Sequence, residues 1–134
     1  MKRYHVFSFL TVAVLAGLGV VTPARAGVSE DLNAFKTAAN DLRASMVSIV
    51  DEATAKSNLS SLDAAITRYN NASNALDTSL NALDRSTETN ARLYDSTQTD
   101  KQTASDALSS EQMRLLASVP IAAVVAAELA IIRT

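Results

Sequence analysis

Glycine and proline are missing from a long stretch of this sequence, and this feature narrows the possible folds most. Between Val28 and Val119, 92 residues contain neither residue type. Strands, hairpins and tight loops depend on both, because glycine permits positive φ and proline fixes turns. Alanine, the strongest helix former, is abundant in the same stretch. The sequence therefore predicts an all-α fold.

Apolar residues recur in this stretch at alternating steps of three and four, which places them at heptad positions a and d of helices. They form two series, which start at Leu32 and at Leu59. We expect the larger side chains of both series to form a seam between helices and to be the interaction residues of the chain. These residues are Leu32, Phe35, Leu42, Met46, Ile49, Leu59, Leu62, Ile66, Tyr69, Leu76, Leu80 and Leu83.

The two series differ in phase, and the change falls at residues 54–58. One explanation is that the chain reverses about residues 56–57, with Ser57, Asn58 or Ser60 as the N-cap of the second helix. The other is one long helix that oligomerises and is locally overwound at this point.

The charges beside the seam favour reversal. Folding the chain about residues 56–57 brings Lys36 opposite Asp77 and Arg43 opposite Asn70. An exposed ion pair contributes only about 0.2–1 kcal/mol, so it selects an orientation more than it stabilises the fold. We therefore predict an antiparallel, coiled-coil-like helical hairpin over residues 27–94.

The first 26 residues have the three zones of an export signal. The chain starts with the positive pair Lys2-Arg3, continues with an uncharged apolar run over residues 6–21, and reaches the small-x-small pattern Ala24-Arg25-Ala26. We expect residues 1–26 to be a signal peptide that is removed, so that the mature chain begins at Gly27. The expected location is the periplasm, the cell envelope or the extracellular space. An uncleaved anchor is the alternative, but the apolar run is short for one.

The composition of the expected mature chain excludes several functions. It holds 9 Lys and Arg against 14 Asp and Glu, a formal charge of −5, so we expect no nucleic-acid partner. It has no Cys, and the one His, His5, lies in the expected signal, which excludes most metal sites and nucleophile–base pairs. No phosphate loop, zinc signature or calcium loop occurs. We expect no enzyme, cofactor or metal site, and no small-molecule substrate is evident.

Residues 95–109 change the character of the chain. They are mostly Ser, Thr, Gln and Asp with few apolar residues. Such a segment buries too little apolar surface to order itself. We expect a polar linker here.

The C-terminal segment, residues 110–134, has the opposite composition. From residue 115 to 132, Ser118 and Glu128 are the polar residues, and a helix that is apolar on every side is either buried or in lipid. A helix from residue 110 to 133 would be about 36 Å long, enough to cross a hydrocarbon core. We expect a membrane anchor, with Glu128 as a possible contact between membrane helices. A core helix of a three-helix bundle and a removable lipid-anchor signal are the alternatives.

The function expected from these features is that of an exported, membrane-tethered structural or interaction protein, which assembles with itself or another helical partner. The first alternative is a membrane-active protein whose C-terminal helix forms a pore or coat. The second is a soluble secreted three-helix bundle that binds a protein or an apolar ligand. The stretch from Leu59 to Leu83 resembles the helical repeats of small bacterial envelope lipoproteins. The sequence lacks Cys, so the resemblance implies neither their lipid anchor nor their attachment to the cell wall.

Overall fold

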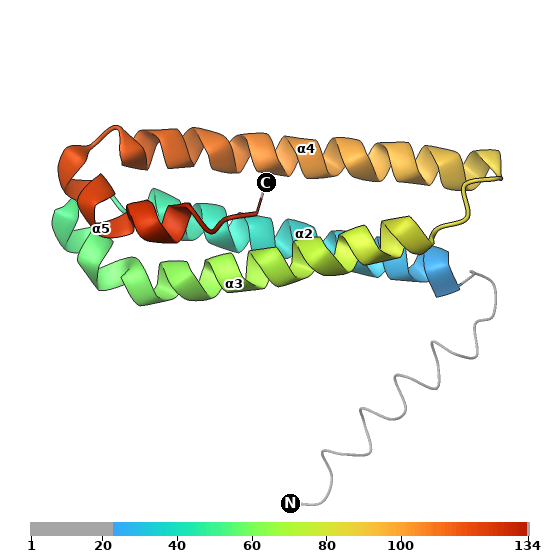
Figure 1. The fold of residues 1–134 in the computed structure, drawn as a ribbon, viewed down its shortest axis with the longest axis horizontal. Helices are drawn as coiled ribbons and strands as arrows, with labels where there is room; N and C mark the ends of the chain where they lie inside the picture. The colour runs from blue at the N-terminus through green and yellow to red at the C-terminus, as the bar shows by residue number, and fades with distance from the viewer. Residues whose placement is uncertain (1–22, 134) are drawn as a thin grey trace, which may run out of the picture.

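The structure is a computed structural model, and it describes residues 23–133. Four helices make up this part of the protein. They are α2 (Pro23–Val47), α3 (Glu52–Ala82), α4 (Glu88–Leu116) and α5 (Val119–Leu129), and residues 23–133 contain no strand. Successive helices run in opposite directions, and the short α5 folds back beside α3 and α4 (Figure 1). The predicted all-α fold is confirmed. Most of the predicted signal, residues 1–22, lies outside the described residues.

The hairpin of α2 and α3 is also confirmed, but its turn was predicted in the wrong place. The chain reverses over residues 48–51, not at 56–57. Asp51 caps α3: its carboxylate accepts a hydrogen bond from the Thr54 backbone amide at 2.8 Å, and the Asp51 amide donates to the Thr54 hydroxyl at 3.0 Å. This reciprocal pair satisfies two amides at the helix start. Ser60, a predicted cap, lies inside α3.

The predicted linker over residues 95–109 is helical and belongs to α4. The chain turns before α4 begins. The Thr87 side chain accepts a hydrogen bond from the Asn90 amide at 3.3 Å and caps the start of α4. Although the segment is polar, α4 has a sparse inner stripe at spacings of four and seven: Leu93, Thr97, Ala104, Leu108 and Leu115. This stripe faces the common core, where the main helix contacts of α4 are with α2 and α5. Burial against an existing core orders a helix whose own sequence is mostly hydrophilic.

The predicted continuous helix from residue 110 to 133 is wrong as well. Helix α4 ends at Leu116, and α5 begins at Val119 with Pro120 in its first turn. Proline lacks the amide hydrogen that a continuing helix needs and clashes with the carbonyl four residues earlier, but it fits a helix start. None of the described helices is long and apolar enough to cross a membrane.

The core lies between α2 and α3 and extends to one side of α4 and α5. With 11 residues, α5 is about 16 Å long, whereas the 31 residues of α3 span about 46 Å. Its inner face places Ile121, Val125 and Leu129 in the core. One half of the molecule is therefore a four-helix bundle and the other half a three-helix bundle, as Figure 1 shows.

The residues after α5 are held against α3. The Asn70 side chain donates to the Ile131 carbonyl at 2.9 Å and accepts from the Arg133 amide at 2.8 Å. The Arg133 guanidinium reaches Asp77 at 3.0 Å. These contacts fix the C-terminal segment near the middle of the bundle.

Candidate interaction surface

The predicted seam residues lie inside the molecule. Leu32 and Leu59 are partly buried, and the other ten are buried: Phe35, Leu42, Met46, Ile49, Leu62, Ile66, Tyr69, Leu76, Leu80 and Leu83. They pack within one chain, where α2 and α3 meet. A partner therefore has to contact other side chains.

The predicted charge pairs across the hairpin do not form. The Lys36 ammonium lies 3.0 Å from Asp100 of α4, while Asp77 pairs with Lys101 and Arg133. Arg43 does not meet Asn70, whose side chain binds the backbone after α5. The prediction was wrong because the turn lies several residues earlier than expected, which shifts the register of α2 against α3, and because α4 and the C-terminal segment supply partners of their own.

Glu128 lies on α5, partly buried against α3. Its carboxyl group meets that of Asp63, and the hydrogen bond between the two, followed by desolvation and the charge of Asp63, raises the pKa of Glu128. A hydrogen bond between two carboxyl groups requires one proton, so the pair favours the protonated form of Glu128. In this structure Glu128 is a contact between α5 and α3.

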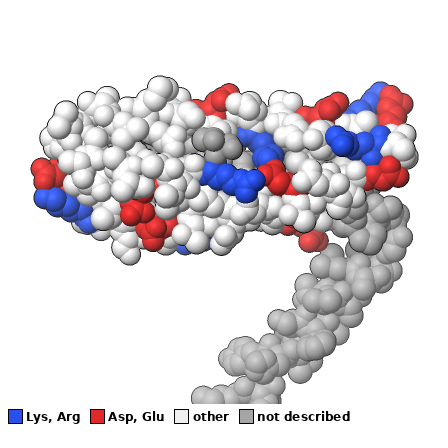
Figure 2. Space-filling view, in the orientation of Figure 1, with Lys and Arg blue, Asp and Glu red and all other residues white. Residues whose placement is uncertain are grey.

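Large exposed aliphatic side chains gather at the end of the bundle where α2 meets α3 and α4 meets α5. We call this surface the apolar end; it consists of Val47, Val50, Met113, Leu116 and Val119. Their exposed fractions range from 47% to 80%. Figure 1 shows both chain connections at this end, and Figure 2 shows a large area without charge on the same half of the molecule.

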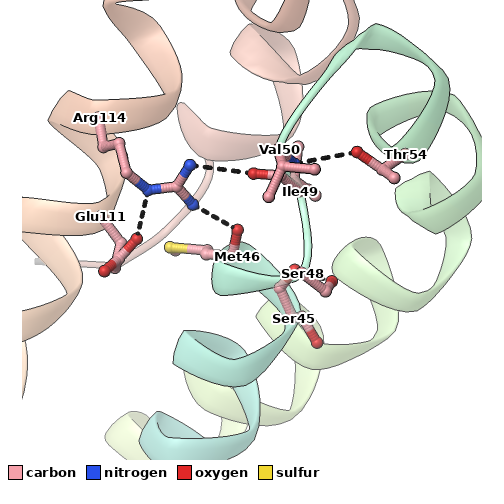
Figure 3. A network of polar contacts seen from close by, with 8 residues as sticks. All are labelled: Ser45, Met46, Ser48, Ile49, Val50, Thr54, Glu111 and Arg114. Carbon is pink, nitrogen blue, oxygen red and sulfur yellow. Dashed lines mark hydrogen bonds and ion pairs between the residues drawn. The ribbon is translucent and has the colours of Figure 1, made fainter.

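Arg114 holds the two connections of this end together (Figure 3). Its Nη2 donates to the Met46 carbonyl at 2.7 Å, its Nη1 donates to the Ile49 carbonyl at 3.0 Å, and its Nε pairs with Glu111 at 2.8 Å. The Met46 carbonyl lies in the last turn of α2, where helix carbonyls have no partner in their own helix. Sequence reasoning missed Arg114, because nothing in the spacing of α4 shows which carbonyls its side chain reaches.

The outer face of α5 adjoins the apolar end and carries no polar side chain. Its exposed residues are Val119, Pro120, Ala123, Ala126 and Ala127. Exposed helix faces of small proteins are normally polar. The uncharged surface therefore extends from the apolar end along α5.

The part of the chain between residues 23 and 133 has no group of three or more acidic, His or Cys side chains that could hold a metal ion. Comparison with protein-family models, with curated proteins and with solved structures finds no match for this chain. The function is therefore argued from the surface and its chemistry.

Proposed function

We propose that this chain is an exported helical interaction protein that binds a protein partner through its apolar end. The observation that supports this proposal is the gathering of five large, exposed aliphatic side chains at one end of the bundle. An exposed apolar patch on a small protein is typical of an interaction site. The Arg114 contacts hold the backbone beneath this patch, so little ordering is needed when a partner binds.

A second copy of the chain is the first partner to test, because a surface at the end of a rod can pair with its own copy about a two-fold axis. We expect sedimentation velocity to reveal a reversible dimer as concentration rises. Replacing Leu116 and Val119 by Ser should abolish this dimer. The control is Ile131→Ser, since Ile131 is 54% exposed but lies after α5, away from the apolar end.

A chain that stays monomeric at every concentration would overturn self-association. A dimer that the Leu116 and Val119 substitutions leave intact, or that Ile131→Ser weakens equally, would overturn the assignment to the apolar end. In either case another helical partner or another surface would have to be sought.

Export is the second part of the proposal. The first described buried residue is Val28, so cleavage after Ala26 removes no side chain of the described core. We expect the intact mass of the protein isolated from its host to correspond to a chain that begins at Gly27. A mass that includes residues 1–26 would identify that segment as an anchor instead.

A membrane-associated function is the second candidate, and the composition of residues 115–132 favours it. Glu128 is the one charged residue of this segment, and the joint at residues 117–118 connects α4 to α5. In this alternative, α5 leaves the bundle and lies in a bilayer, as a tether or as part of a pore. In a flotation assay with phosphatidylcholine vesicles, the chain should then be recovered with the vesicles in the top fraction. A variant without residues 119–134 should remain in the bottom fraction.

Dye release from the same vesicles separates the two membrane functions. A pore-forming protein releases the dye, whereas a tether binds the vesicles and leaves them sealed. Failure of the chain to float with vesicles would overturn both.

A further inference from the structure

A small cleft opens beside the point where the C-terminal segment meets α3 and α4. Its volume is about 130 Å³, and its walls come from all three long helices and from Arg133. Figure 2 shows basic and acidic side chains together near the middle of this face, beside the large uncharged area. The cleft reaches the helix seam at Phe35 and Tyr69 and lies apart from the apolar end.

The inner wall of the cleft is formed in part by two hydroxyl-bearing residues of α3. Tyr69 is 2% exposed and Ser73 is 5% exposed, and both line the cleft. Both carry a hydroxyl group; the buried side-chain oxygen that lacks a hydrogen-bond partner among the described residues is a different one, that of Thr97 on α4. A ligand in the cleft would accept hydrogen bonds from these two hydroxyl groups.

The Tyr69 hydroxyl is suited to act as a donor. Burial raises its pKa, and the nearby charge of Asp77 raises it further, so it remains protonated at neutral pH. Its ring packs on Phe35, with the ring centroids 5.3 Å apart and the planes inclined at 41°. Phe35 also lines the cleft, which gives the inner wall an aromatic part beside the hydroxyls.

The mouth of the cleft carries more positive than negative charge. Asp77 pairs through one carboxylate oxygen with Lys101 and through the other with Arg133. Lys101 and Arg133 line the cleft with it, so these three residues have a net charge of +1. An ammonium has three donors and a guanidinium has five, so both cations retain donors after they bind Asp77. The Lys101 side chain is 20% exposed, which limits the screening of its charge by water.

We propose that this cleft binds a small organic anion, a monocarboxylate with a short apolar chain. Lys101 and Arg133 would receive the carboxylate, the hydroxyls of Tyr69 and Ser73 would donate to it, and Phe35 would contact the apolar chain. The size fits, because a cavity of about 150 Å³ in another protein accommodates benzene. The ligand is therefore expected to contain about six non-hydrogen atoms, as butyrate does.

The test is a titration of the ¹⁵N-labelled full chain, in the form in which it is isolated, with sodium butyrate, followed by NMR. We expect saturable shifts of the amide signals around the cleft, with a dissociation constant on the order of millimolar, as so few atoms allow. Butyramide has the same shape without the charge, and it should give no saturable shift at the same concentrations. Inorganic phosphate tests whether any small anion suffices, and it should bind more weakly because it has no apolar chain.

Three variants assign the binding to the cleft. Lys101→Met should weaken butyrate binding about tenfold, because it removes a charge-assisted contact. Ser73→Ala should weaken it about threefold, and alanine is the better helix former, so the fold is retained. Lys36→Met is the matched control: it removes the same charge from a lysine of α2 that pairs with Asp100 and does not line this cleft. It should bind butyrate as the parent does.

Three results would overturn the proposal. The first is the absence of saturable shifts with butyrate. The second is equal binding of butyramide or phosphate, which would show that the cleft does not select a carboxylate with an apolar chain. The third is an equal loss of affinity in Lys36→Met and Lys101→Met, which would show attraction to the general surface charge only.

Discussion

Arg114 stabilises the end of a helix to which it does not belong. It extends from α4 and donates to carbonyls of Met46, in the last turn of α2, and Ile49, in the loop that follows. A cation near a helix C-terminus also interacts favourably with the helix dipole. One side chain thus connects α4 with the turn of the α2–α3 hairpin.

Replacing Arg114 by Met should therefore lower the free energy of unfolding by about 1.5–3 kcal/mol, the range for hydrogen bonds to charged groups. Chemical denaturation measures this loss. The control is Arg92→Met, which removes an ion pair between side chains that are both 78% exposed, and such pairs contribute at most about 0.5 kcal/mol. Equal losses in the two variants would contradict the bridging role of Arg114.

Glu128 makes the docking of α5 depend on pH. Because the hydrogen bond to Asp63 raises the pKa of Glu128 in the folded state, the folded protein binds this proton more tightly than the unfolded chain does. The stabilisation is fully present below the unfolded pKa, and it is lost as pH rises through the raised folded pKa. Above this range the shared proton is lost and the hydrogen bond between the two groups is lost with it.

Glu128→Gln should thus raise the melting temperature at neutral pH, because the amide donates to Asp63 without a proton from solution. The difference from the parent should shrink as the pH falls through the range in which carboxyl groups titrate. Glu30→Gln controls for the loss of one negative charge, since Glu30 is an exposed residue of α2. A melting temperature of Glu128→Gln that equals the parent's at neutral pH would show that the two acids do not interact.

The start of α3 depends on Asp51 and Thr54, which form the capping box. Asp51→Ala should destabilise the protein by about 0.5–2 kcal/mol, the usual cost of losing an N-cap. Ser60→Ala, at the cap position predicted from the phase change, should have little effect, because Ser60 is an exposed residue inside α3. Urea denaturation measures the free energy of unfolding of both variants. A larger loss for Ser60→Ala than for Asp51→Ala would contradict Asp51 as the N-cap of α3.

The helices themselves could largely be predicted from the sequence, because the missing glycine and proline and the heptad spacing are both local signals. The hairpin followed from the two apolar series. Its turn was misplaced because the change of heptad phase falls inside α3, whereas the chain reverses at residues 48–51. The signal that could have located the turn was the pair Asp51 and Thr54, an N-cap residue followed three positions later by a side chain that reaches back.

The remaining elements were harder to predict, for two different reasons. Residues 95–109 form a helix because the core of the other helices, α2 above all, offers a surface against which a few apolar side chains can pack. Composition alone does not contain that surface. The break before α5 did have a local signal in Pro120, which the uniform apolar composition of residues 115–132 obscured. The cleft depends on Tyr69, Asp77, Lys101 and Arg133, which are far apart in the sequence, and no spacing rule connects them.

Across the whole molecule, α5 covers apolar surface of α3 and α4. Removing residues 119–134 deletes the buried side chains of Ile121, Val125, Leu129 and Ile132, each of which contributes about 1.5–3 kcal/mol on burial. We expect the shortened chain to lose most of the 5–15 kcal/mol typical of a domain and to bind the dye anilinonaphthalene sulfonate. Ala126→Ser, on the exposed face of α5, should change neither the free energy of unfolding nor the dye binding. An unchanged denaturation midpoint after the deletion would mean that α5 does not dock.

The main contacts between helices form a closed circuit, from α2 to α3, from α3 to α5, from α5 to α4 and from α4 back to α2. The helix that closes this circuit, α5, follows the three long helices in the sequence and therefore leaves the ribosome after them. The three long helices can therefore begin to associate during synthesis, but the four-helix half is completed only after α5 has emerged. A chain that is exported as proposed must stay unfolded until it has crossed a membrane. A fold whose closing helix follows the three long ones delays its own completion, which suits such a route.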